Sequence, residues 1–206
     1  MKDLVTQIKR DRRIGGEFRG VVATMAGLLA VLWGLEAIDA LVLGGGLDRF
    51  GVAPRQLSGL LGIFAAPFLH GDWGHIASNT VGIVVLGGLT MLVGRREFVW
   101  VSLVGMVVGG LGTWIFGRPA IHIGASGVVF AYFGYLLLRG WYDRRVGSIV
   151  LATVVVWFHG SMLFGMVPGF TPPAISWEGH LFGFIGGVLA ARMLHKRVRP
   201  GAGSAK

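Results

Sequence analysis

The sequence contains no cysteine, which excludes disulfide bonds, thiolate zinc sites and a cysteine nucleophile. Charged residues are also scarce, at 14% of 206 residues against roughly a quarter in an average soluble domain. Hydrophobic residues make up 53% of the chain. This balance excludes a cytosolic globular protein and a disordered tail protein, and it indicates a single unit embedded in a lipid bilayer.

Six apolar stretches of membrane-spanning character are separated by short joints that carry charges or proline and glycine. They run over residues 21–43, 75–93, 98–116, 124–138, 146–166 and 180–194. The first is too long for a cleaved signal peptide, and it carries Glu36 and Asp39. The sequence therefore predicts an all-α integral membrane protein, a bundle of six transmembrane helices. Its predicted parts are a basic N-terminal segment over 1–20, a membrane domain over 21–195 and a tail over 196–206.

The net charge of +9 is unevenly distributed along the chain. Sixteen of the 19 lysines and arginines lie in the N-terminal segment, in the second and fourth joints and in the C-terminal segment, which leaves Arg49, Arg55 and Arg118. By the positive-inside rule, both termini and these sixteen residues are predicted to be cytoplasmic, in a bacterial plasma (inner) membrane. The charge thus indicates topology, with contacts to anionic lipid headgroups as a secondary effect. No nucleic acid partner is predicted, because the basic residues flank spans and lack interleaved aromatic residues.

With this orientation, the second, fourth and sixth spans begin on the external side, and polar side chains gather at these three starts. Ionisable residues inside a span are costly and indicate function by default. The polar residues are His70, His75, Ser78 and Asn79 at the second span, His122 and Ser126 at the fourth, and Glu178 and His180 at the sixth.

The depths of these residues can be counted from the cytoplasmic charge that ends each span. At about 1.5 Å per residue, Ser126 lies roughly 20 Å above that charge, and His180 and Asn79 each lie about 24 Å above theirs. In a hydrocarbon core about 30 Å thick, all three lie about 6 to 10 Å below the external surface. They are therefore predicted to share one cavity, with His75 one turn above Asn79 on the same helix face.

A hydroxyl and an imidazole at matched depth are the minimum for nucleophilic acyl transfer, in which the histidine takes the serine proton and later gives it to the leaving amine. Asparagine and histidine donors beside them suit an oxyanion hole. Gly124 and Gly127 flank Ser126 and allow close approach of a substrate backbone. Gly183 and Gly187 continue the His180 face and predict tight packing of the sixth span on the fourth.

Together these features resemble the rhomboid family of intramembrane serine proteases. The resemblance covers about residues 20–195 and rests on three motifs in order: HGDWGHIASN with His75 and Asn79, GASG around Ser126, and GHLFGFIGG with His180. It implies that Ser126 is the nucleophile, that His180 is the general base, and that His75, Asn79 and the Ser126 N–H form the oxyanion hole. It also implies transmembrane protein substrates, cut near their external end, with no cofactor or metal.

This sequence departs from the family pattern in two places. Phe130 stands where the family commonly has tyrosine, and no Trp-Arg pair occurs in residues 53–70, the stretch that resembles the family's first external loop. Because Phe130 lies four residues after Ser126, its ring is predicted to lie one turn below the nucleophile, where His180 can stack on it.

Three other interpretations remain open. A catalytically silent relative that binds transmembrane clients would typically lack the serine or the histidine, and both are present. A metal transporter or metallohydrolase could use His70, His75, His122 and His180, but the chain has no HExxH motif and no carboxylate on the same face as a histidine pair. His75 and Asn79 could instead tie the second span to the first loop.

His70 and His122 are interpreted as structural, and Glu178 as an N-terminal helix charge. The sequence leaves the oligomeric state open.

Overall fold

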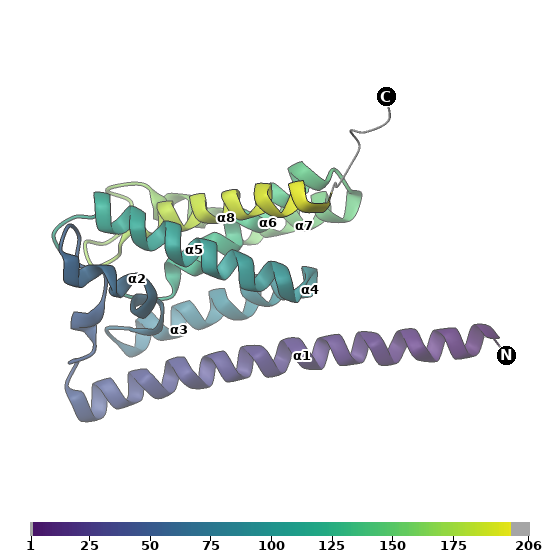
Figure 1. Ribbon diagram of the computed structural model, residues 1–206, viewed down its shortest axis with the longest axis horizontal. Coiled ribbons are helices and arrows are strands. Elements are labelled where there is room, and N and C mark those ends of the chain that lie inside the picture. Colours follow the sequence, from purple (N-terminus) through teal and green to yellow (C-terminus); the bar gives the residue numbers. More distant parts are fainter. Residues whose placement is uncertain (1, 199–206) are drawn as a thin grey trace.

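A computed structural model describes the backbone of residues 2–198 and the side-chain surroundings of residues 15–195. The described chain is built from helices, with a single isolated β-bridge between Val52 and His122. The long helix α1 (Lys2–Ile38) lies along one side, and α5 (Arg95–Phe116), α6 (Ser126–Asp143) and α8 (Trp177–Val198) lie side by side above it (Figure 1). The start of α1 and the end of α8 lie at the same end of the molecule (Figure 1). The predicted tail over 196–206 falls outside the described side chains.

Four of the described helical segments are long and apolar enough to cross a membrane by length and composition: Gly15–Leu43, Trp73–Val93, Arg95–Phe116 and Val146–Met166. The chain is therefore an all-helical integral membrane protein. The remaining two predicted spans correspond to α6 and α8, which form helices but do not reach this apolar level. The count of six spans stays a prediction.

The second predicted span consists of three consecutive helical pieces. It comprises α3 (Trp73–Gly82), a π-helical segment η5 (Ile83–Gly87) and α4 (Gly88–Val93). The Asp72 carboxylate accepts a hydrogen bond from the His75 backbone N–H at 2.8 Å and caps the start of α3. The helix therefore begins two residues before the predicted start of the span.

Helix α6 is the centre of the bundle, and it packs most extensively on α8, with further contacts to α7 (Val146–His159) and α5. Two glycines of α8 permit the close approach. A Cβ atom added at Gly183 would lie 2.1 Å from the Gly127 carbonyl oxygen, and one at Gly187 would lie 2.0 Å from that of Ala131. Small residues let helix backbones meet in this way, and the predicted packing of these two spans is confirmed.

The segment between α1 and α3 folds back over the end of the bundle as short helical turns: η1 (Asp39–Leu43), η2 (Asp48–Phe50), η3 (Leu57–Leu60), α2 (Gly62–Ala65) and η4 (Ala66–Phe68). The Trp114 indole donates to the Gln56 carbonyl at 2.8 Å, and the Arg55 guanidinium donates to the Gly117 carbonyl at 2.8 Å. Both bonds anchor the loop to the end of α5.

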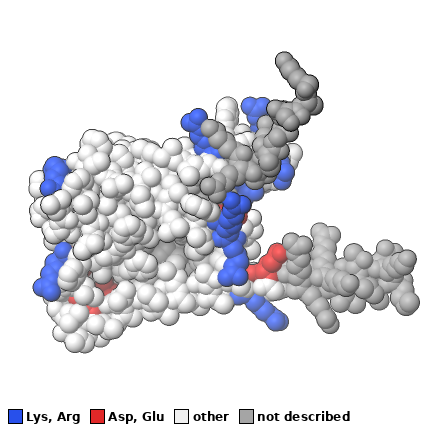
Figure 2. Space-filling model, viewed as in Figure 1, with Lys and Arg blue, Asp and Glu red and all other residues white. Residues whose placement is uncertain are grey.

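Charged side chains avoid the middle of the molecule. In Figure 2 the lysines and arginines lie at the two ends of the described body, and an uncharged band separates them. Large apolar side chains are exposed within the apolar helical segments, including Val84, Leu103 and Trp157. An exposed apolar band between two charged ends fits a protein whose sides face lipid.

Candidate active site

Ser126 and His180 lie in contact at the ends of two packed helices. Ser126 is the first residue of α6, and His180 lies in the first turn of α8. Their side chains meet with 2.9 Å between Ser126 Oγ and His180 Nε2. The structure therefore brings together the two residues that the sequence predicted to share one depth.

The imidazole of His180 is held from two further sides. His180 Nδ1 donates to the Gly165 carbonyl at 2.9 Å, because a carbonyl oxygen can only accept. With the proton on Nδ1, a neutral ring leaves Nε2 free to accept the hydrogen bond of the Ser126 hydroxyl. The Phe130 ring lies 4.1 Å from the imidazole between centroids, at an interplanar angle of 10°. The predicted stacking contact is present, and Phe130 supplies it without a hydroxyl.

Gly165 belongs to η6 (Gly160–Met166), the 3-10 continuation of α7. Its role as acceptor was not foreseen from the sequence, since every residue carries a carbonyl and residue type gives no signal of its use.

His75 and Asn79 lie beside the loop that leads into α6. Gly124 has φ of +111°, and a Cβ atom there would lie 2.5 Å from His75 Nε2 and 3.6 Å from Asn79 Nδ2. Only glycine suits this position, because the backbone is left-handed and the histidine occupies the space of a side chain. Asn79 is buried and donates from Nδ2 to the His75 carbonyl at 3.1 Å. His75, Asn79 and Gly124 thus lie together just before the start of α6.

A polar network ties together the loops that precede α6 and α8. His122 Nδ1 lies 2.7 Å from Ser176 Oγ, and its Nε2 donates to the Arg118 carbonyl at 3.1 Å. The buried Glu178 carboxylate accepts from the Arg118 backbone N–H at 3.1 Å and lies 3.7 Å from the Arg118 guanidinium. Ser176 Oγ accepts from the Gly179 N–H at 3.1 Å and caps α8. Glu178 therefore binds Arg118 and not His180, which places it outside the Ser126–His180 pair.

His70 lies behind His75 and is only 2% exposed. The two rings are 5.1 Å apart in an edge-on arrangement, and neither nitrogen of His70 has a hydrogen-bond partner among the described residues. Burial, reinforced by the neighbouring His75, lowers the pKa of His70 to about 4. The ring is therefore neutral at physiological pH and fills space beneath His75.

No group of three or more histidine, aspartate or glutamate side chains within residues 15–195 is arranged to hold a metal ion. The four histidines of the metal interpretation are used differently: His122 binds Ser176, His180 binds Ser126, and His70 packs on His75.

A cavity of about 50 Å³ lies next to Ser126, between Gly127, Thr113 and Ser176. It is large enough for water molecules close to the hydroxyl.

Comparison with known proteins places the whole site within one matched region. The family model described as "Rhomboid domain" matches residues 57–197. Uncharacterized protein Rv1337 of Mycobacterium tuberculosis is 39% identical over an alignment of 178 residues that covers 83% of this chain and 74% of the relative. Uncharacterized protein ML1171 of Mycobacterium leprae is 35% identical over 91% of this chain and 76% of its own length. Rhomboid protease GluP of Bacillus subtilis is 27% identical over 61% of this chain and 24% of its own length.

Proposed function

Because the chain belongs to the rhomboid family, we propose that it is an intramembrane serine endopeptidase with Ser126 as nucleophile and His180 as general base. The observation that carries the proposal is the 2.9 Å contact between Ser126 Oγ and His180 Nε2. The Gly165 carbonyl holds the proton of the ring on Nδ1, so Nε2 is the nitrogen available to take the hydroxyl proton. A serine and a histidine so arranged support acyl transfer.

The proposed reaction proceeds in two steps. In the first, Ser126 Oγ bonds to the scissile carbonyl carbon while its proton passes to His180 Nε2; the peptide C–N bond then breaks, and His180 gives the proton to the leaving amine. In the second, a water oxygen attacks the ester carbon and passes a proton to His180. That proton returns to Ser126 as the ester bond breaks, which releases a carboxylic acid and regenerates the hydroxyl.

We assign the oxyanion hole to His75, Asn79 and the backbone N–H of Ser126. Asn79 uses one N–H on the His75 carbonyl, and its amide carries a second N–H that can serve an oxyanion. The first N–H groups of a helix have no intrahelical partner and favour negative charge, which supports the start of α6 as a further donor. Gly124 supports the site by bringing the backbone against His75 and Asn79.

The proposed substrates are transmembrane segments of other membrane proteins. Peptide bonds inside a helix are shielded, so cleavage is expected near the external end of a segment, where helix-breaking residues let the backbone unwind. We further propose six spans with both termini cytoplasmic and the site open to the external side. The positions of the α1 start and the α8 end at one end of the bundle support this topology (Figure 1). The alternative is a silent relative that binds transmembrane clients without cutting them.

Labelling with a fluorophosphonate tests the nucleophile directly. The purified protein should be labelled, and Ser126→Ala should abolish labelling. Ser126→Ala and His180→Ala should each abolish cleavage of a model transmembrane substrate, and the double variant should be no worse than either single one, because residues that act as a unit are not additive. A folded wild-type protein that binds the substrate but neither reacts with the probe nor cuts would establish the silent alternative.

Replacement of Asn79 distinguishes a role as an oxyanion donor from a structural role in linking α3 to the first loop. Asn79→Ala should lower the cleavage rate by about 10²-fold, the scale of one lost oxyanion donor, and should leave measurable activity. The measurement is specific activity per folded protein. A lower yield of folded protein with unchanged specific activity would instead assign Asn79 to the link between α3 and the first loop.

A further inference from the structure

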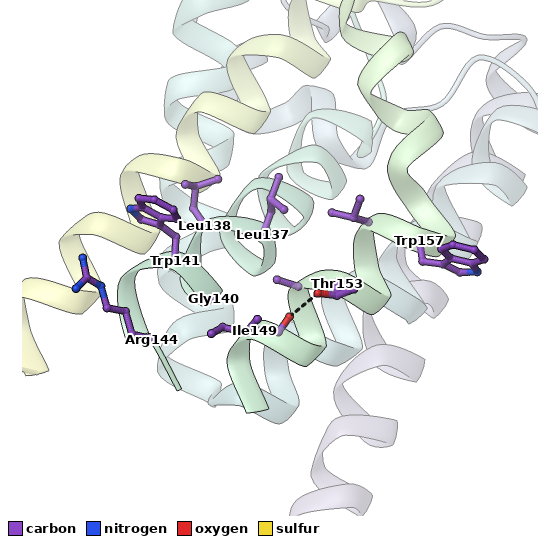
Figure 3. Close-up of a pocket in the computed structure, with 10 residues that line it drawn as sticks. Leu137, Leu138, Gly140, Trp141, Arg144, Ile149, Thr153 and Trp157 are labelled. Atoms are coloured by element: carbon purple, nitrogen blue, oxygen red, sulfur yellow. Dashed lines mark hydrogen bonds between the residues drawn. The ribbon is translucent and has the colours of Figure 1, made fainter. Parts of the chain in front are cut away.

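An apolar groove of about 770 Å³ runs between α6 and α7, away from the Ser126 site. One face of α6 and one face of α7 form its sides, and Trp141 and Trp157 lie on opposite sides of it in Figure 3. The only hydroxyl in its lining, that of Thr153, donates to the Ile149 carbonyl one turn back, at 3.0 Å. Apart from that hydroxyl, the Arg144 guanidinium and the indole N–H groups of Trp141 and Trp157, the lining offers a ligand no polar side chain.

The floor of the groove is the point where the two helices touch. A Cβ atom added at Gly140 would lie 3.0 Å from Ala152 Cβ and 2.9 Å from the Ser148 carbonyl oxygen. The groove is therefore closed at its base and open toward the outer surface of the bundle. A transmembrane helix, about 10 Å wide, does not fit down to this contact, whereas a hydrocarbon chain does.

A second cavity, of about 230 Å³, adjoins the groove at the end of α6. Trp141 and Arg144 line both cavities, and Tyr142 and His195 complete the smaller one. The His195 ring stacks on Tyr142 with 5.7 Å between centroids. An apolar groove thus continues into a small chamber that presents aromatic rings, an imidazole and a guanidinium.

The charges in this chamber favour an anion. Asp143, the acidic residue next to the chamber, already accepts from Arg139 Nε at 2.7 Å and from Ser148 at 3.1 Å, and it lies 3.6 Å from His195 Nδ1. Arg144 has no ion-pair or hydrogen-bond partner for its side chain among the described residues. Its guanidinium therefore carries a positive charge that is available to a ligand.

We propose that this composite site binds an anionic glycerophospholipid, with the phosphate at Arg144 and His195 and one acyl chain in the groove between α6 and α7. Arginine suits the phosphate because its planar donors match the phosphate oxygens. Trp141 lies where the two parts meet, which is the place of an aromatic ring at a membrane interface. The volume of the groove lies within the range of about 300–1,000 Å³ for small-molecule sites.

The headgroup is tested by native mass spectrometry of the full-length protein, purified in detergent and supplied with phosphatidylglycerol or phosphatidylcholine of the same acyl chains. Phosphatidylglycerol should be retained preferentially, and Arg144→Gln should lower its retention about five- to tenfold, the scale of one arginine near an anionic lipid. Arg145→Gln is the matched control, because it removes the same charge one residue away without lining either cavity. If both variants lost phosphatidylglycerol retention equally, the effect would be a general attraction between positive charge and anionic lipid, and the proposal would be overturned.

The groove is tested by filling it. Thr153→Phe adds a ring inside the groove, and it should lower retention of phosphatidylglycerol while leaving Ser126 labelling by the fluorophosphonate unchanged. Glycerol 3-phosphate, which has the headgroup but no chain, should not compete at millimolar concentration. Competition by glycerol 3-phosphate, unchanged retention in Thr153→Phe, or a shift of the wild-type protein to a dimer that Thr153→Phe abolishes would each overturn the proposal.

Discussion

Helices α8 and α7 both pack on α6, but they do so in very different ways. Helix α8 meets α6 backbone to backbone through Gly183 and Gly187. The Val146–Met166 segment contains α7, and only 6% of the residues in its most apolar stretch are buried. The corresponding share in Trp73–Val93 is 44%. The distance between Ser126 and His180 is thus set by a close backbone contact between two helices, whereas the Gly165 carbonyl that orients His180 belongs to the least buried of the four apolar segments named above.

This difference separates two properties of the site. Rigid packing fixes where the nucleophile and the base lie, and a lightly buried segment fixes which nitrogen of the base carries the proton. Segments with few buried contacts open at low free-energy cost. We therefore expect changes in the α6–α8 contact to affect folding and rate together, and changes in η6 to affect the rate alone.

The largest effect is expected from Gly183→Ala. The added methyl group would lie 2.1 Å from the Gly127 carbonyl oxygen, so the two helices must separate. Overpacking of this kind costs about 1–3 kcal/mol of unfolding free energy, and a displacement of about 1 Å at a catalytic pair costs about 10²-fold in rate. Thermal unfolding and specific activity are to be measured together.

Gly147→Ala in α7 is the matched control, since a Cβ atom there has nothing within 4 Å. It should leave both quantities unchanged or raise stability slightly, because alanine favours a helix over glycine. Equal damage from the two substitutions would contradict the contrast between α8 and α7.

An intermediate effect is expected at Phe130. Phe130→Ala removes the ring that stacks on His180 at 4.1 Å, and it should lower the cleavage rate by more than about tenfold while the protein stays folded in detergent. Phe130→Tyr keeps the aromatic face and should change the rate by less than about tenfold. Normal cleavage by Phe130→Ala would show that the α6–α8 packing and the Gly165 carbonyl hold the base without the ring.

The remaining effect, which is confined to acid pH, concerns His70. The pKa of His70 falls from 6.5 to about 4 on burial, so between these values the unfolded chain binds a proton that the folded protein does not. Stability therefore declines as pH falls from about 6.5 toward 4, by on the order of 1–3 kcal/mol from this group. In His70→Gln, the difference in unfolding temperature between pH 7 and pH 4.5 should shrink. An unchanged difference would mean that His70 is already protonated or exposed in the folded protein.

Much of the site could be predicted because its signals are local. The spacing of Gly183 and Gly187 predicts the face that packs on α6, and the four-residue separation of Phe130 from Ser126 predicts the stacked ring. The start of α3 could have been placed correctly from Asp72, since aspartate is a favoured capping residue. The roles of these residues in catalysis remain predictions.

Other parts could not be predicted, because they depend on contacts between distant segments. The Gly165 carbonyl and the bond from Trp114 to the Gln56 carbonyl involve main-chain oxygens, which every residue possesses. The network of Arg118, His122, Ser176 and Glu178 joins two loops that lie more than fifty residues apart. The interpretation of Glu178 as an N-terminal helix charge described its place correctly but missed Arg118 as its partner.

The π-helical segment Ile83–Gly87 has a consequence for insertions and deletions in this chain. A π turn holds one more residue than an α turn, and such turns often occur near functional sites. Removing one residue here would let the segment relax to an α-helix, and the parts before and after it would keep nearly the same angular relation, because the π turn already absorbs the extra residue within about one turn. His75 and Asn79 would then still point toward Gly124. The same deletion within α3, between Asn79 and the π turn, would instead turn both side chains by about 100° relative to α4.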